Sequence, residues 1–243
     1  MVDTGFNSAV FNMDLDESLF RKALENPDIP PVLRIYGFHR PAITYGYSQK
    51  ISKHWLEDPF YESAKRVTGG GLVFHGKDMT YSVLAGYQHR KVFSSLCGSY
   101  RAFHEIVQRA FAKINFTVDF LEEKKSGSGA KNLCFLAPVK HDLLYQGKKV
   151  AGAAQKRSGG YFLHQGSVNF RVFLAAGLGR STQAAARGQV ESVLADNEDY
   201  RAFYEKYKTA FIAAFREYFS VDFAETVVLA PQERGLEALS WTR

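Results

Sequence analysis

KRVTGGGLVFH, at residues 65–75, contains three consecutive glycines, Gly69, Gly70 and Gly71. Without Cβ atoms, glycines let backbone N–H groups approach an anionic or carbonyl-bearing ligand, to which Arg66 can add a bidentate charged contact. A β-turn between two strands explains the glycines equally well. The stretch contains neither GxGxxG nor GK[ST], so it matches no standard nucleotide-binding loop.

Two later stretches also carry residue types suited to a ligand pocket. GKKVAGAAQ, at residues 147–155, places Lys149 before a run of small residues that permit close approach of an acyl chain or a nucleotide. A turn with a solvated lysine is the plain alternative. FLHQGSV, at residues 162–168, reads as a strand whose His164 and Ser167 either meet a ligand or hydrogen-bond each other.

The composition is that of a folded protein. The 243 residues are 46% hydrophobic and 23% charged, and no repeat divides them, so we expect a single domain over residues 1–243. The net charge of +6 is scattered along the chain, which argues against nucleic acid as a partner. No run approaches the roughly 18 apolar residues of a membrane span. The acidic N-terminal stretch does not resemble a signal peptide, so we expect a cytoplasmic protein without a membrane partner.

Apolar periodicity predicts the secondary structure. Helices are expected at residues 8–24, 99–115 and 197–219, and strands at 32–36, 42–47, 116–121 and on both sides of Lys148-Lys149. The strands at 32–36 and 42–47 are predicted to form a hairpin or to lie side by side. The polar, glycine-rich segment 122–129 is predicted to be a mobile loop. The pattern favours an α/β (α+β) fold with a mixed, largely antiparallel sheet packed by helices.

In this order, the three stretches resemble the motifs of the biotin/lipoate protein ligase superfamily, which line one pocket: a glycine-rich motif, GKK(V/I)xG and HxG(S/T). Residues 66–75, followed by the TYS at 80–82, resemble the R-x-(S/T)-G-G-(G/R)-x-V-x-H…(T/N)-Y-S pattern of the lipoate and octanoate branches. Residues 32–49 resemble the early R-x-(Y/W)…P-x-(I/L)…G-x-x-Q segment. The C-terminal third matches only loosely.

The resemblance implies a class II synthetase-like catalytic domain that attaches an octanoyl or lipoyl group to one lysine of a lipoyl-domain or glycine-cleavage carrier protein. His75 and His164 are candidates to accept the proton of that lysine. The pocket residues that it implies are Arg66, Gly69, Gly70, Gly71, Leu72, Val73, Phe74, His75, Gly152, Ala153, Ala154, His164, Gly166 and Ser167.

Two cysteines are present, Cys97 and Cys134, without CxxC spacing or a metal-binding pattern. NLCFLAP, at residues 132–138, resembles the segment that holds the acyl-accepting cysteine of one octanoyltransferase branch. By this resemblance Cys134 takes the acyl group from an acyl carrier protein as a thioester, without a cofactor. Lys149, at the matching distance downstream, would favour the thiolate and stabilise the oxyanion. A buried, inert cysteine is the alternative.

The other branch is an ATP-dependent lipoate-protein ligase, which activates free lipoate or octanoate as an acyl-adenylate with ATP and Mg²⁺. Arg66 and Lys149 would then face carboxylate and phosphate charges, and residues 71–74 would lie against the nucleotide. Gly71 is typical of these ligases, whereas the transferases carry arginine at that position. Gly76 and Gln165 stand where many members carry aspartate and histidine.

The length of the chain favours the transferase, since the longer ligases add a C-terminal accessory domain, although some carry it on a separate polypeptide. A family member that binds carriers or acyl chains without catalysis is the third possibility, because a fold does not fix a function.

Overall fold

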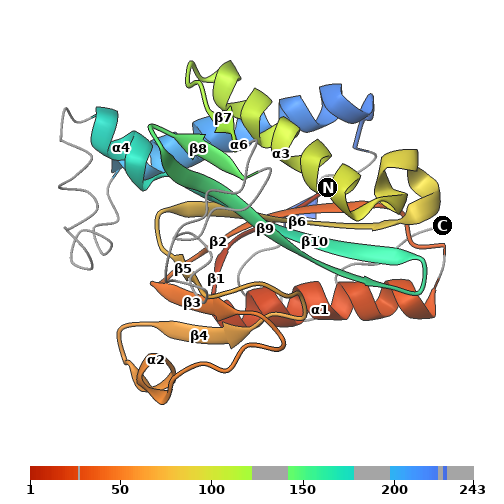
Figure 1. Cartoon of the computed structure of the whole chain (residues 1–243), viewed down its shortest axis with the longest axis horizontal. Helices are drawn as coiled ribbons and strands as arrows, with labels where there is room; N and C mark the ends of the chain where they lie inside the picture. The colour runs from red at the N-terminus through yellow and green to blue at the C-terminus, as the bar shows by residue number, and fades with distance from the viewer. Residues whose placement is uncertain (27, 122–141, 178–197, 224–226, 229–243) are drawn as a thin grey trace.

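The computed structural model describes residues 1–26, 28–121, 142–177, 198–223 and 227–228. Within them the strands form an eight-stranded sheet, in the order β11-β1-β2-β6-β10-β9-β8-β7, and a three-stranded sheet, in the order β4-β3-β5 (Figure 1). The strands of the larger sheet are β1 (Val2–Asn7), β2 (Val32–Phe38), β6 (Asp78–Gly86), β7 (Asp119–Phe120), β8 (Leu143–Tyr145), β9 (Lys148–Ser158), β10 (Tyr161–Asn169) and β11 (Val227–Val228). The smaller sheet contains β3 (Ala42–Tyr45), β4 (Glu62–Lys65) and β5 (Val73–His75).

The larger sheet is mixed. β1 runs parallel to its two neighbours, β2 and β11, and all the other pairs from β2 to β7 are antiparallel. In the smaller sheet, β3 is parallel to β4 and antiparallel to β5. The prediction of a mixed, largely antiparallel sheet is therefore confirmed.

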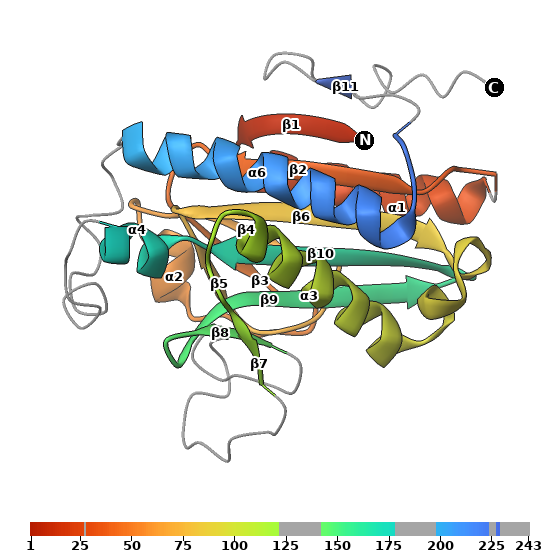
Figure 2. The ribbon, with the colours of Figure 1, turned by 90° about the horizontal axis from the view of Figure 1, so that it is seen from above.

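Helices cover both faces of the larger sheet. α3 (Leu96–Lys113) and α6 (Glu198–Phe219) lie side by side over one face, and α1 (Ala9–Glu25) lies on the other (Figures 1 and 2). Shorter helices are α2 (Lys53–Glu57), α4 (Arg171–Gly177) and the 3₁₀ turns η1 (Tyr87–His89) and η2 (Lys91–Ser94). Among the described helices, none has both the length and the apolar character needed to cross a membrane.

The three predicted helices are confirmed, with small shifts at their ends. α1 begins after Ser8, whose hydroxyl accepts a hydrogen bond from the backbone N–H of Phe11 and so caps the first turn. α3 begins three residues earlier than predicted, because Ser95 caps it by accepting from the N–H of Gly98. The buried aromatic face of α6, which includes Tyr207 and Phe211, packs against the sheet as core.

Two strand predictions are wrong in part. β2 and β3 do not pair, because both edges of β2 are taken by β1 and β6, and the chain after Pro41 enters the smaller sheet. Residues 116–121 give only the short β7, since Asn115 adopts a left-handed conformation (φ 68°) and the N–H of Phe116 still bonds to the carbonyl of Phe111. The strands around Lys148-Lys149 are confirmed as β8 and β9. The predicted loop at 122–129 lies outside the described residues.

A fully buried ion pair joins α1 to the larger sheet. The guanidinium of Arg34 on β2 lies 2.8 Å from the carboxylate of Asp16 on α1, and neither side chain is exposed. Asp16 also accepts hydrogen bonds from Tyr36 (2.8 Å), Ser82 (2.7 Å) and Gln165 (2.7 Å). These bonds satisfy the carboxylate on both oxygens, so the pair fixes α1 relative to three neighbouring strands.

We expect Asp16→Ala to lower the free energy of unfolding by about 3–5 kcal/mol, because it leaves the Arg34 guanidinium buried without its carboxylate. Urea unfolding followed by circular dichroism measures the change. Asp14→Ala is the matched control, since Asp14 lies on the same helix but is exposed, and its effect should stay within about 0.5 kcal/mol. Equal effects of the two substitutions would contradict this account.

Candidate active site

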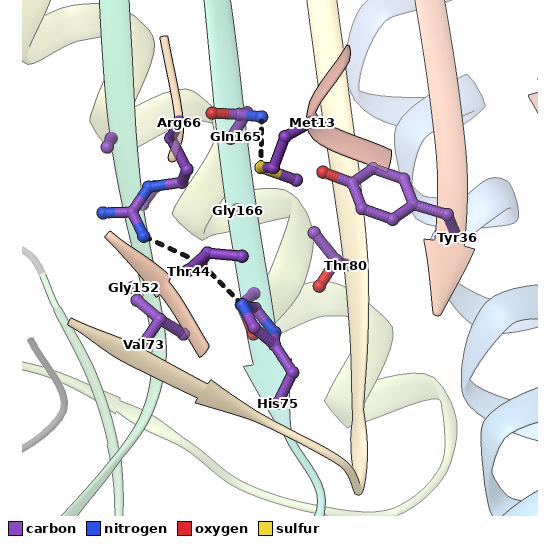
Figure 3. Close-up of a pocket in the computed structure, with 13 residues that line it drawn as sticks. Met13, Tyr36, Thr44, Arg66, Val73, His75, Thr80, Gly152, Gln165 and Gly166 are labelled. Atoms are coloured by element: carbon purple, nitrogen blue, oxygen red, sulfur yellow. Dashed lines mark hydrogen bonds between the residues drawn. The ribbon is translucent and has the colours of Figure 1, made fainter. Parts of the chain in front are cut away.

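A narrow pocket lies between the α1 face of the larger sheet and the smaller sheet (Figure 3). Its volume is about 30 Å³, and its lining is largely apolar. The lining residues come from α1, four strands of the larger sheet, the smaller sheet and the position directly after β4. The lining residues are Met13, Tyr36, Thr44, Arg66, Val73, His75, Thr80, Gly152, Ala153, Ala154, Gln165, Gly166 and Ser167.

Strand alternation decides which side of β10 faces this pocket. Gln165 and Ser167 point into it, whereas Phe162 and Val168 pack beneath α3 and α6. Gly166 lines the pocket through its backbone, because a Cβ there would collide with the ring of Tyr81 on the face covered by α3 and α6. β10 therefore separates the pocket from the core by a single layer of backbone.

Arg66 holds the glycine-rich loop in place. Its guanidinium donates to the hydroxyl of Thr44 (2.8 Å) and to the carbonyls of Gly69 (2.9 Å) and Gly71 (2.8 Å). Gly70 adopts a left-handed φ of 89°, which favours glycine. The loop's backbone passes so close to Gly46 that a Cβ at Gly46 would strike it.

The residues after the glycines alternate between two environments. Val73 and His75 line the pocket, and Leu72 is buried. Phe74 belongs to an aromatic cluster with Trp55 and Tyr61, at ring-centroid distances of 5.2 Å and 5.7 Å, and does not line the pocket. Of the predicted run 72–75, the structure thus brings two side chains to this pocket.

Both ring nitrogens of His75 are engaged. Nε2 lies 2.8 Å from the Thr44 hydroxyl and Nδ1 lies 2.7 Å from the carboxylate of Asp78. Asp78 also accepts from Thr80 and Ser167. Burial alone would raise the pKa of Asp78, but the adjacent His75 and hydrogen bonds from His75, the Gly76 backbone and Ser167 together hold it below its ordinary value. The carboxylate therefore stays ionised and orients the imidazole.

A β-bulge places Lys149 beside Gly152, which lines the pocket. Leu143 pairs with Ala151 and Leu144 with Lys149, so Val150 is an extra residue on β9. Val150 and Ala151 both pack in the core under α3 and α6. Lys149 consequently takes the opposite face, where its Nζ lies 3.0 Å from the position of a Cβ on Gly152. The absence of a side chain on Gly152 leaves the space that Lys149 fills.

The ammonium of Lys149 forms a buried ion pair. It lies 2.7 Å from the carboxylate of Asp142, and the side chains are 2% and 4% exposed. A buried ammonium is costly unless it is paired, so Asp142 stabilises the lysine in its position beside Gly152. Asp142 was not predicted from the sequence, because no local pattern marks an aspartate seven residues before Lys149 as its partner.

His164 lies on the other face of the sheet. Its ring stacks among aromatic side chains under α3, with Phe103 at 4.4 Å between ring centroids. Gln155 donates to Nδ1 (3.0 Å), so Nε2 carries the proton of the neutral ring and lies 3.3 Å from the Tyr81 oxygen. Burial first, and then the charge of the nearby His104, hold the pKa of His164 well below its ordinary value of 6.5. The structure does not bring His164 to the pocket.

This buried histidine should make the fold sensitive to mild acid. The folded-state pKa lies below that of the unfolded chain, so the contribution of His164 is fully present above about pH 6.5. It is lost as the pH falls below that value, by up to about 1.4 kcal/mol per pH unit. Urea unfolding at several pH values should show a smaller acid loss for His164→Gln than for the unsubstituted chain. The exposed His54 gives the control His54→Gln, and parallel slopes for all three proteins would refute the assignment.

Several other pocket residues were not predicted from the sequence, namely Met13, Tyr36, Thr44, Thr80 and Gln165. Gln165 was noted only as a departure from the family pattern. It accepts from Thr68 (2.6 Å) and donates to Asp16 (2.7 Å), so it ties the glycine-rich loop to the buried ion pair. Cys134 lies outside the described residues, and its role stays a prediction.

Comparisons with known proteins agree with this arrangement. A family model described as the lipoyl protein ligase A/B catalytic domain matches residues 8–194. Octanoyltransferase LipM of Oceanobacillus iheyensis is 35% identical over 164 residues, which are 66% of this chain and 59% of that protein. LipM of Bacillus subtilis is 33% identical over 177 residues, 69% and 63% of the two chains. The matched region thus spans about three fifths of these relatives.

A longer match and two solved structures extend the comparison. LipM of Carboxydothermus hydrogenoformans is 31% identical over 242 residues, 94% of this chain and 89% of that protein. Lipoate-protein ligase A bound with ATP superposes with a TM-score of 0.64 at 19% identity, covering 94% of this chain and 90% of that one. The putative lipoate protein ligase Ta0514 of T. acidophilum gives 0.65 at 19% identity, with 94% and 88% covered. At these identities the structures show a shared fold.

Proposed function

Because the chain belongs to the family of lipoyl protein ligase A/B catalytic domains, we propose that it transfers an octanoyl group from a carrier thioester to a lysine of a lipoyl-domain protein. The observation that carries the proposal is the buried Lys149–Asp142 pair, whose lysine lies against Gly152 in the lining of an apolar slot. An apolar slot suits a hydrocarbon chain, and an ammonium beside it suits the reacting carbonyl. The names of the three relatives described above, each an octanoyltransferase, favour the same reaction.

The proposed reaction has two steps. The thiolate of Cys134 attacks the acyl carbonyl, a new C–S bond forms, and the donor's thioester bond breaks so that the carrier thiol leaves with a proton. The acceptor lysine's amine then attacks the enzyme thioester. A C–N bond forms, the bond to Cys134 breaks, and the amine's proton balances the released thiolate. The donor and the acyl-enzyme intermediate are both thioesters, so the acyl group is already activated and the reaction needs no ATP.

Lys149 has two tasks in this scheme. Its positive charge favours the thiolate form of Cys134, and the same charge stabilises the oxyanion that develops on the carbonyl oxygen in each step. Asp142 holds the ammonium in position, and Gly152 gives it room. The small side chain of Ala154 lets the acyl chain approach β9 closely.

The test is a transfer assay with two arms, each containing the unlipoylated lipoyl domain. One arm supplies octanoyl-acyl carrier protein without ATP, and the other supplies free octanoate with ATP and Mg²⁺. Intact mass of the lipoyl domain should show one octanoyl group in the first arm alone. Modification only in the second arm overturns the proposal in favour of an ATP-dependent ligase. Modification in neither arm overturns it in favour of a binding protein.

A further inference from the structure

The pocket runs across four adjacent strands of the larger sheet. Gly152 on β9 and Gln165 on β10 are followed by Thr80 on β6 and Tyr36 on β2. Neighbouring strands are about 4.8 Å apart, so this path is about 14 Å long. An extended eight-carbon chain measures about 9 Å from its bond lengths. A chain whose carbonyl lies beside Lys149 therefore points its methyl end at β2.

The pocket must widen to admit such a chain. Its volume of about 30 Å³ is room for only about two water molecules, since one water needs roughly 10–15 Å³. Most side chains at the far end are fixed by buried hydrogen bonds: Tyr36 to Asp16, and Gln165 to both Asp16 and Thr68. These groups cannot move aside without leaving a buried polar atom unpaired.

Met13 is the exception at the far end. It projects from α1 into the pocket beside Gln165 and Tyr36 (Figure 3), and it is 4% exposed. Its sulfur accepts a weak hydrogen bond from the amide nitrogen of Gln165, 3.7 Å away, and its side chain otherwise packs in an apolar cluster with Tyr36 and Phe38. An unbranched thioether with three rotatable bonds adapts its shape at little cost. Met13 is therefore the lining side chain best able to make room and to end the slot.

We propose that Met13 sets the length of acyl chain that the enzyme accepts. The inference rests on the proposed function, because it takes the slot to hold the acyl chain. With Met13 folded back, an eight-carbon chain fits between Lys149 and α1. Its side chain then closes the slot against longer chains. Replacement by alanine removes three heavy atoms and opens space for two to three further carbons.

The test measures kcat/KM for the decanoyl and octanoyl acyl carrier proteins and compares their ratio between variants. Met13→Ala should raise the decanoyl-to-octanoyl ratio by about tenfold or more, as expected when a pocket gains room for whole methylenes. Met79→Ala is the matched control. Met79 is fully buried on β6, but it packs on the opposite face of the sheet, under α3 and α6. It loses the same atoms and should leave the ratio unchanged.

An unchanged ratio in folded Met13→Ala overturns the inference while leaving the proposed function intact. If Met13→Ala does not fold, Met13→Val replaces it, and the ratio should still rise several-fold because valine has a shorter reach. An equal rise in Met79→Ala also overturns the inference, since it would reflect general loosening. Failure of the unsubstituted chain to transfer octanoyl from its carrier would instead refute the proposed function.

Discussion

Cys134→Ala should abolish octanoyl transfer, with a loss of about 10³-fold or more, because the covalent intermediate has no other acceptor in the proposed scheme. Intact mass spectrometry after incubation with octanoyl-acyl carrier protein should show one octanoyl group on the unsubstituted enzyme. The adduct should be labile to hydroxylamine, as a thioester is, and it should be missing from the alanine variant.

Cys97→Ala is the natural control for this experiment, since Cys97 is an exposed free cysteine at the start of α3. It should keep both the adduct and the transfer rate. Full activity in Cys134→Ala would rule out the thioester route. An adduct that disappears only with Cys97→Ala would move the acyl acceptor to the other cysteine.

Lys149→Met should lower transfer by about 10²–10³-fold, the effect of removing one group that stabilises an oxyanion. It should also lower the free energy of unfolding by about 3–5 kcal/mol, because Asp142 would keep its buried charge without the ammonium. Transfer assays and urea unfolding measure the two effects separately. Lys148→Met changes the neighbouring, half-buried lysine and should alter transfer less than about threefold if general charge is unimportant.

The double variant Asp142→Asn/Lys149→Met separates catalysis from folding. It removes both charges, so most of the lost stability should return, while transfer should stay as low as in Lys149→Met. Recovery of activity together with stability would show that Lys149 acts only as a structural residue. Persistent instability with normal transfer would likewise contradict the proposed role.

Local patterns were enough to predict the helices and the class of sheet. The periodicity of α1, α3 and α6 carries over several turns, and Ser8 marks a helix start by simple chemistry. The partners of strands are a different matter. Nothing near residues 42–47 indicates that β3 joins another sheet, because strand pairing depends on which edges distant segments have already taken.

The motifs indicated which residues lie near one another better than they indicated the directions of their side chains. Arg66, His75 and Ser167 do meet in one pocket, as the motifs suggested. Side-chain direction was harder to foresee, because a one-residue difference reverses the face: His164 points into the core and Gln165 into the pocket. Regular alternation would also have put Lys149 on the face of Ala151, and only the bulge at Val150 reverses this. A bulge depends on the partner strand and leaves no local signature.

The Gln165 amide that connects Thr68 to Asp16 has a chemical consequence of its own. An amide offers a permanent donor and a permanent acceptor, and neither changes with acidity. An imidazole in that place would lose its acceptor on gaining a proton near neutral pH, because both of its nitrogens would then be donors. The hydrogen bonds of Gln165 therefore connect the glycine-rich loop to the protein interior in the same way throughout the physiological pH range.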